Sequence, residues 1–170
     1  MHSVAELRRR ARARLPRVIF DFIDGGAGDE AALRRNETAF QHRCLLPRVF
    51  RPCRERDLST SLLGRRYALP FGVTPMGLCD LAWPGTDRAL AAAAARAQIP
   101  YTLSTMASTA IEPIARIAPE YTWFQIYLGG DPATADMLLD RAQAAGIETL
   151  VLTVDANFTA RRLRDRANGF

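Results

Sequence analysis

The sequence predicts an α/β fold, because short apolar segments alternate with segments of helical length from about residue 67 onward. The apolar segments span 71–75, 101–105, 123–128 and 149–155. Helices are expected at 86–98, 111–117 and 132–145, and a charged run, 161–165, follows the last apolar segment. Strands that are separated by helices of roughly 10 to 15 residues form βαβ units and a parallel sheet.

Four such units fit either a doubly wound sheet or half of an eight-stranded barrel. The C-terminal ends of the expected strands carry polar or special residues, namely Thr74-Pro75-Met76-Gly77, Ser104-Thr105, Gln125 and Tyr127, and Thr153 and Asp155. A barrel mouth takes side chains from every strand, whereas a doubly wound sheet concentrates them at one switch point. We therefore expect the first half of a (β/α)8 barrel, and an incomplete one, since a whole barrel needs on the order of 250 residues.

The first 66 residues form an N-terminal helical and irregular segment in this interpretation, and residues 67–170 form the truncated barrel. Pro16 is suited to start a helix, and Val18, Ile19, Phe22 and Ile23 would give that helix a buried face. The glycine-rich stretch 25–28 would end it, Asp29 would cap a further helix through Phe40, and 42–66 would be irregular. No strand precedes the glycines, so they do not form a nucleotide-binding fingerprint.

The net charge of +5 comes from arginine alone, because the chain contains no lysine. The arginine-rich run 8–14 suggests a nucleic-acid patch or a transit peptide. However, Val4, Leu7, Ala11 and Leu15 recur at helical spacing, and no aromatic residues are interleaved with the arginines. We therefore expect an amphipathic helix with a solvated arginine face, and no nucleic-acid partner.

Three cysteines, Cys44, Cys53 and Cys79, are scattered without the spacing of a zinc site or a disulfide framework. No apolar run approaches the roughly 18 residues of a spanning helix, and no signal peptide is visible. These features favour a cytoplasmic protein. Its contact with the inner face of the cytoplasmic membrane, if there is one, would come from regions outside this chain.

At this level of detail the chain resembles the FMN-dependent 2-hydroxy acid dehydrogenases and oxidases, the family of glycolate oxidase, flavin L-lactate dehydrogenase and mandelate dehydrogenase. The resemblance runs from about residue 4 to residue 170. Its markers are Leu15-Pro16-Arg17, the stretch 20–27, Leu69-Pro70-Phe71, the stretches 75–78, 99–105, 123–127, 152–155 and 161–165, and Asn168-Gly169-Phe170. Each marker alone is weak, and their order and spacing together carry the resemblance.

The resemblance implies FMN at the barrel mouth and hydride transfer from an L-2-hydroxy acid to the cofactor. It implies that the backbone of Pro75, Met76 and Gly77 passes along the flavin, and that Ser104, Gln125 and Thr153 hydrogen-bond the ring. Tyr127 and Arg162 would face the substrate, with the arginine pairing its carboxylate. A guanidinium fork and short polar groups suit these partners chemically.

Each residue alone also has a purely structural interpretation. Ser104 and Thr153 would bond local backbone, Tyr127 would pack in the barrel, and Arg162 would belong to a solvated charged face. Gln125 is harder to explain in this way, because an amide on an apolar strand must find a partner. Phe22 departs from the family, which usually has at this position a tyrosine that helps to hold the substrate carboxylate.

The resemblance places the catalytic histidine, a companion arginine, a flavin-side lysine and the FMN phosphate site in a second half, outside this chain. His2 and His42 precede the barrel and are poor candidates for a base. We expect the whole protein to be a homo-oligomeric enzyme and the 170-residue segment alone to be inactive. The alternatives are another FMN- or phosphate-binding barrel enzyme, and a non-catalytic split-gene or decayed remnant.

Overall fold

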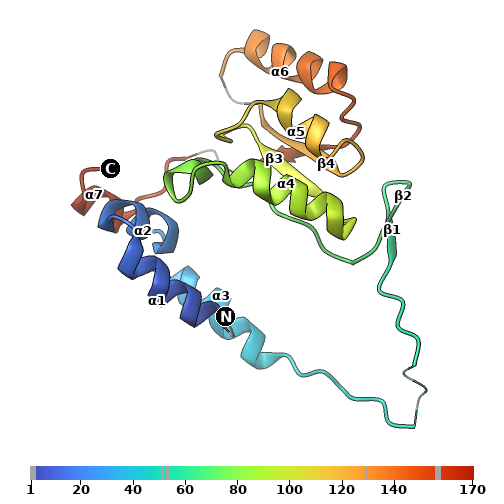
Figure 1. Ribbon diagram of the computed structural model, residues 1–170. Helices are drawn as coiled ribbons and strands as arrows, with labels where there is room; N and C mark the ends of the chain where they lie inside the picture. The colour runs from blue at the N-terminus through green and yellow to red at the C-terminus, as the bar shows by residue number, and fades with distance from the viewer. Residues whose placement is uncertain (1–2, 51, 53, 129, 156–157) are drawn as a thin grey trace. The chain divides into compact units, whose positions relative to one another are not determined.

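The computed structural model describes residues 3–50, 52, 54–128, 130–155 and 158–170 (Figure 1). Contacts divide the chain into two compact units, Met1–Cys53 with Phe158–Phe170, and Arg54–Asn157. This division differs from the boundary at residues 66 and 67 that the sequence suggested, which stays a prediction. Cys53 lies outside the described residues.

The first unit is helical, as the sequence predicted. It contains α1 (Val4–Arg14), α2 (Arg17–Asp24), α3 (Ala31–Ala39), the short 3-10 helix η1 (Phe40–His42) and α7 (Leu163–Ala167). The Ser3 hydroxyl accepts the Glu6 amide at 3.2 Å and so caps α1. Pro16 precedes α2, and Gly25 follows its last residue. Helix α3 starts one residue after Glu30, which has a left-handed backbone, and the Asp29 carboxylate accepts the Ala31 amide.

The buried face of α2 is only partly the one that the sequence pattern predicted, since Val18, Ile19 and Phe22 are half-buried. Phe20 is the buried residue of this helix, whereas Ile23 is 57% exposed. Helix α2 contacts both α1 and α7, and these two neighbours decide which side of α2 is covered. The hydrophobic periodicity of one helix does not contain that information.

Ion pairs tie α7 to α2 within this unit, although the two helices are about 140 residues apart in the sequence (Figure 1). Arg164 donates from Nη1 to Asp24 at 2.8 Å and from Nη2 to Glu30 at 2.6 Å. Asn168 donates to Asp21 at 2.7 Å, and Arg8 of α1 also pairs with Asp24. The hydrogen bonds from Arg8 and Arg164 hold the pKa of the Asp24 carboxyl below its ordinary value.

The second unit is built on a parallel sheet of β3 (Tyr101–Ser104), β4 (Thr122–Tyr127) and β5 (Leu150–Thr153), in that order. Its helices are α4 (Thr86–Ala97), α5 (Ile111–Ile117) and α6 (Pro132–Ala144), preceded by the 3-10 helix η2 (Cys79–Leu81). The α/β class and the order of these elements are confirmed. The described residues form no closed barrel.

The first expected strand, 71–75, is reduced to one bridge between Val73 and Tyr101. Val73 donates to the Pro100 carbonyl at 2.8 Å and accepts the Thr102 amide at 3.0 Å. Pro70 and Pro75 flank this short stretch, and proline has no N–H to extend the ladder. The prediction of a strand was therefore right about its direction and place but wrong about its length.

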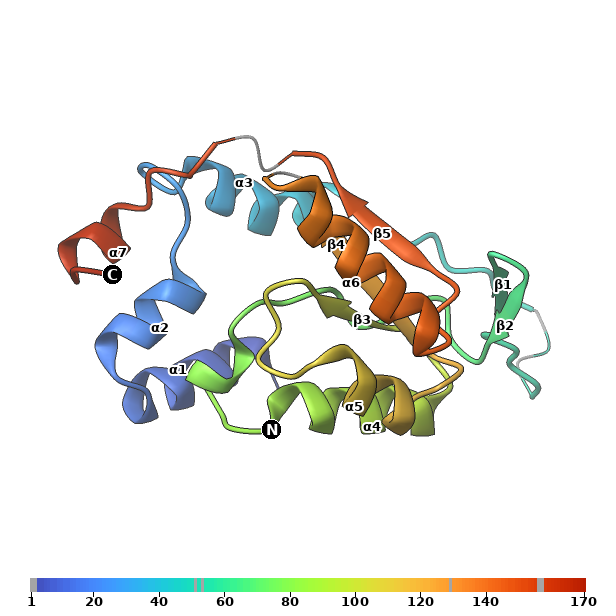
Figure 2. The ribbon, with the colours of Figure 1, turned by 90° about the horizontal axis from the view of Figure 1, so that it is seen from above.

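The core of the second unit lies between one face of the sheet and the helices. Leu103, Phe124 and Ile126 point toward this side and are almost fully buried, together with Ile114 of α5 and Ala94 of α4. Helices α4 and α5 pack side by side (Figure 2). Alternation along a strand sends the neighbouring residues, among them Ser104 and Gln125, to the opposite face.

A hairpin that the sequence did not predict precedes the sheet. Strands β1 (Thr60–Leu62) and β2 (Arg65–Tyr67) pair antiparallel in the region that was expected to be irregular. The two turn residues, Leu63 and Gly64, both have positive φ, at 50° and 79°. Leucine rarely adopts this conformation, and three-residue strands are too short to show alternation, so the usual hairpin signals were absent.

No helix among the described residues has the length and apolarity that a membrane span requires.

Replacing Glu112 with glutamine should remove a pH-dependent part of the stability of the second unit. Arg141 of α6 donates to Glu112 of α5 through Nε at 2.8 Å and Nη2 at 3.0 Å, which lowers the pKa of the Glu112 carboxyl from 4.5 to about 2. A carboxyl with a lowered pKa stabilises the fold above its unfolded pKa and loses this contribution as the pH falls through its folded pKa.

The measurement is the thermal unfolding midpoint of wild type, Glu112→Gln and the exposed control Asp136→Asn. The gap between wild type and Glu112→Gln should be full above pH 4.5 and close toward about pH 2. A gap that is independent of pH, or one that the control reproduces, would contradict the assigned role of this ion pair.

Candidate functional site

Three of the residues that the sequence singled out lie together at the carboxyl ends of adjacent strands. Ser104 ends β3 and is in register with Gln125 of β4, while Thr153 ends β5 in register with Tyr127. Their side chains lie on the face of the sheet opposite the helix-packed core. The Gln125 side chain is the most deeply placed of them, with 2% of the residue exposed.

The Gln125 amide is the centre of a hydrogen-bond network. Its Oε1 accepts the Ser104 hydroxyl at 3.1 Å and the Thr105 amide at 3.2 Å. Its Nε2 donates to the Thr153 hydroxyl at 2.8 Å. The Gln125 backbone carbonyl also accepts the Thr105 hydroxyl at 2.6 Å. The orientation of the amide is therefore fixed by both neighbouring strands.

This network leaves unused hydrogen-bonding capacity on Gln125 and Thr153. A primary amide has two N–H groups, and within the described part of the chain Nε2 of Gln125 uses one of them. The Thr153 hydroxyl accepts that bond and keeps its own proton available. Ser104 is more fully used, because it also accepts the Met106 amide at 3.1 Å, as the structural interpretation expected. Carbonyl oxygens and ring nitrogens of a flavin suit such donors.

The loop with Pro75, Met76 and Gly77 is held close to the end of β3. The amide that follows it, that of Leu78, donates to the Met106 carbonyl at 2.9 Å. A Cβ added to Gly77 would lie 2.9 Å from the Met106 Cβ, so only glycine fits this approach. The loop thus lies beside the residue whose amide Ser104 accepts, which fits the role that the resemblance assigns to its backbone.

Asp87, which the sequence reasoning missed, anchors this end of the second unit. It is fully buried in the first turn of α4 and accepts the amides of Ser108 and Thr109 at 2.9 and 3.0 Å. The Tyr101 hydroxyl donates to it at 3.2 Å. Burial, together with the nearby Asp87 charge, raises the pKa of the Cys79 thiol to about 11. In the sequence Asp87 looks like an ordinary helix-start acid, so no signal distinguished it.

The three residues expected to meet the substrate are divided between the units. Tyr127 ends β4 in the second unit and is 38% exposed. Phe22 and Arg162 belong to the first unit, where the structure brings them together. The Arg162 guanidinium donates from Nη2 to the Phe22 carbonyl and lies 5.4 Å from the centroid of the Phe22 ring. The Phe170 ring lies 4.9 Å from the Phe22 ring.

Arg162 and Arg164 differ in how many of their N–H groups already have partners. Arg164 uses both η nitrogens on carboxylates, which raises its pKa further. Arg162 uses Nε on Asp165 and one N–H of Nη2 on a carbonyl, and its side chain is 31% exposed. Within the described residues its other η N–H groups have no partner. Arg162, and not Arg164, is therefore able to form a fork with an incoming carboxylate.

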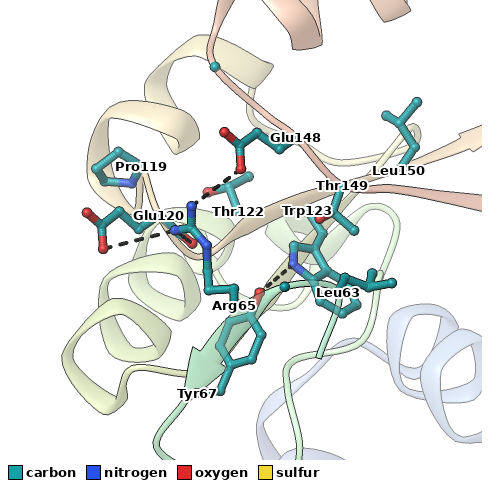
Figure 3. A pocket seen from close by; sticks show the side chains of 12 residues that line it. Leu63, Arg65, Tyr67, Pro119, Glu120, Thr122, Trp123, Glu148, Thr149 and Leu150 are labelled. Carbon is teal, nitrogen blue, oxygen red and sulfur yellow. Dashed lines mark hydrogen bonds and ion pairs between the residues drawn. The ribbon is translucent and has the colours of Figure 1, made fainter. Parts of the chain in front are cut away.

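One cavity of the second unit lies away from this network. A cavity of about 400 Å³ is lined by Arg65, Tyr67 and Trp123, among others, at the amino ends of the strands (Figure 3). Trp123 donates to the Tyr67 hydroxyl at 3.1 Å, and Arg65 pairs with Glu148 at 3.5 Å. These polar groups satisfy one another, and the cavity is at the end opposite Gln125.

Known proteins match this chain along nearly its whole length. The family model described as FMN-dependent dehydrogenase matches residues 11–170. The chain is 42% identical to a 4-hydroxymandelate oxidase of Amycolatopsis orientalis, covering 99% of the chain and 47% of the relative. It is 40% identical to an L-lactate dehydrogenase of Xanthobacter autotrophicus, covering 98% and 43%.

Solved structures agree with this match. A mandelate oxidase variant with (S)-mandelic acid superimposes with a TM-score of 0.94 at 40% identity, over all of this chain and 50% of the other. The chain spans about half the length of the curated relatives it matches. Since the family model covers residues 11–170 and the fold matches about half of a mandelate oxidase, this chain belongs to the family of FMN-dependent dehydrogenases that act on 2-hydroxy acids.

Proposed function

We propose that the protein to which this chain belongs oxidises an L-2-hydroxy acid of the lactate, mandelate or glycolate type to the 2-oxo acid, with FMN as the hydride acceptor. The observation that carries the proposal is the Gln125 network, whose free donors gather at the carboxyl ends of three parallel strands. That edge is where barrels of this kind bind their ligands. The relatives named above act on acids of this class, by their names.

The cofactor would be held by residues of the second unit. Gln125 and Thr153 would donate to the flavin ring, Ser104 would support the amide, and the backbone of Pro75, Met76 and Gly77 would lie along the ring. Gly77 supports this assignment because the absence of a side chain lets that backbone lie close to Met106, whose amide Ser104 accepts. Bound FMN supplies the electron-pair acceptor that no amino-acid side chain provides.

The substrate would be held through its charge and its hydroxyl. Arg162 would form a bidentate pair with the carboxylate, and the phenol of Tyr127 would hydrogen-bond the substrate. A solved mandelate oxidase variant contains (S)-mandelic acid, which is a carboxylate of this class. A cytoplasmic location and a homo-oligomeric whole protein complete the proposal.

The full-length protein should lose its flavin absorption band under anaerobic conditions when L-lactate, L-mandelate or glycolate is added. The isolated 170-residue chain with added FMN should not, because the resemblance places the base that takes the substrate proton outside it. Both are measured by visible absorption, with the D-enantiomer of mandelate as the control. Reduction by the isolated chain, or none by the full-length protein with any of these acids, would contradict the proposal.

Gln125→Leu should weaken both the fold and FMN binding. The change leaves the Thr105 amide and the Ser104 hydroxyl without their buried acceptor, at a cost of roughly 1–3 kcal/mol for each unpaired group. It also removes the donor offered to the flavin. Urea unfolding measures the free energy of unfolding, and quenching of FMN fluorescence measures the affinity for FMN.

The matched control is Gln143→Leu, the same substitution at an exposed position of α6. It should change the free energy of unfolding by less than about 0.5 kcal/mol and leave FMN affinity unchanged. Equal FMN affinity in Gln125→Leu and wild type would sink the cofactor role of Gln125.

Phe22→Tyr should tighten substrate binding. It restores the hydroxyl that the family usually has at this position, beside the Arg162 guanidinium. One added hydrogen bond to a charged group is worth about 1.5–3 kcal/mol, so the KM for the acid should fall by roughly tenfold or more. Steady-state kinetics of the full-length protein measure this, and an unchanged KM would remove Phe22 from the substrate site.

A further inference from the structure

The Arg162 guanidinium is hydrogen-bonded through its Nε to a buried carboxylate. Its Nε donates to Oδ2 of Asp165 at 2.5 Å, three residues further along the chain. Asp165 is 7% exposed, in the first turn of α7. Because the N–H groups of a planar guanidinium have fixed directions, this bond turns the edge with Nε toward Asp165 and leaves the edge between the two η nitrogens facing away from it.

The partners of Asp165 show that this bond is its main polar contact. Its second oxygen, Oδ1, is buried and has no hydrogen-bond partner among the described residues. A buried charged oxygen without a donor is costly, and such cases in native structures call for an explanation. Within the same described part of the chain, Arg162 is the one cation paired with Asp165. The carboxylate is therefore committed to a single guanidinium.

The surroundings of Arg162 leave its side chain little freedom. Nη2 donates to the Phe22 carbonyl, and a Cβ added to Gly25 would lie 3.7 Å from the same nitrogen. That Cβ would also lie 2.6 Å from the Asp21 carbonyl, so the position excludes a side chain. On the Asp165 side, the backbone carbonyl of Asp165 accepts the amides of Asn168 and Phe170, both at 3.0 Å. The group that orients Arg162 is thus itself fixed by the end of α7.

We propose that Asp165 is a positioning residue, which holds the Arg162 guanidinium by Nε so that its free η edge meets the substrate carboxylate in one orientation. The proposal rests on the proposed function and extends it from Arg162 to the residue behind it. Freezing a long side chain before binding removes an entropy cost from the binding step. A rigid fork also discriminates a planar carboxylate from an uncharged group of similar shape.

The test compares a 2-hydroxy acid with its methyl ester, in the full-length protein with FMN bound. Asp165→Ala should raise the KM for the acid by about tenfold or more, with a smaller change in kcat, since lost ground-state binding appears in KM. The KM for the ester, which has no carboxylate to pair, should change by less than about threefold. Asp165→Asn keeps an oxygen acceptor for Nε and should restore most of the affinity for the acid.

Asp21→Ala is the matched control. Asp21 belongs to the same α2–α7 contact, bonding Asn168 and lying 3.8 Å from Arg164, and among the described residues it forms no hydrogen bond or ion pair with Arg162. This variant should lose stability without changing the ratio of the two KM values. If Asp165→Ala fails to fold, Asp165→Glu replaces it, because the longer side chain keeps the charge and displaces the guanidinium. It should then raise the KM for the acid alone.

Three results would overturn the proposal. An equal rise in the KM for the acid and for the ester would show a merely structural role. An unchanged KM for the acid would show that Asp165 has no role in binding it. A lower acid KM in Asp165→Ala would show that Asp165 only weakens the attraction of Arg162 for anions. If the wild-type protein oxidises no hydroxy acid, the proposed function fails separately, and titration of the flavin absorption with phenylglyoxylate still compares carboxylate binding between the variants.

Discussion

The central strand of a parallel sheet must form hydrogen bonds along both edges and have both of its faces covered. In the unit of residues 54–157 this strand is β4. One face is met by the apolar core under α4, α5 and α6, with Phe124 and Ile126 almost fully buried. The other face buries the amide of Gln125, which an apolar strand can hold only if its partners are in place. Ser104 and Thr153, at the ends of the flanking strands, provide them. The same constraint that stabilises the sheet thus aligns the residues that would meet a flavin.

Charge plays the corresponding part in the first unit. The helices there bury little apolar area, with Phe20 as their one buried hydrophobic residue among those described. Carboxylates and arginines join the two ends of the chain instead, through Asp24, Glu30 and Arg164. Such pairs are strong only where geometry fixes both partners. Arginine suits this purpose better than lysine because its planar fork can bond two oxygens at once, and this chain has only arginine as its strong base.

Helix α7 connects structure with the proposed chemistry. Arg164 on this helix has its η nitrogens committed to acids, whereas Arg162, just before it, is held at one edge and open at the other. Two arginines that are two residues apart therefore differ in role: Arg164 holds the helices together, and Arg162 is proposed to bind the substrate. The distinction comes from their partners and not from their residue type. Fold and family set the context, but the assignment of a role depends on such contacts.

The sequence by itself determined the order of the elements, most of their bounds and the family, because strand and helix periodicity are local and the family markers are read in line. It also pointed to Gln125, since an amide on an apolar strand demands a partner. Only the tertiary structure decided which residues are the hydrogen-bond partners of Gln125, which face of α2 is covered, and that Phe22 lies under Arg162. It also revealed the β1–β2 hairpin, Asp87 and Asp165. The reason is physical: these features depend on hydrogen bonds, ion pairs and packing between residues far apart in the chain, or on a positive φ at Leu63, and neither leaves a periodic trace in the sequence.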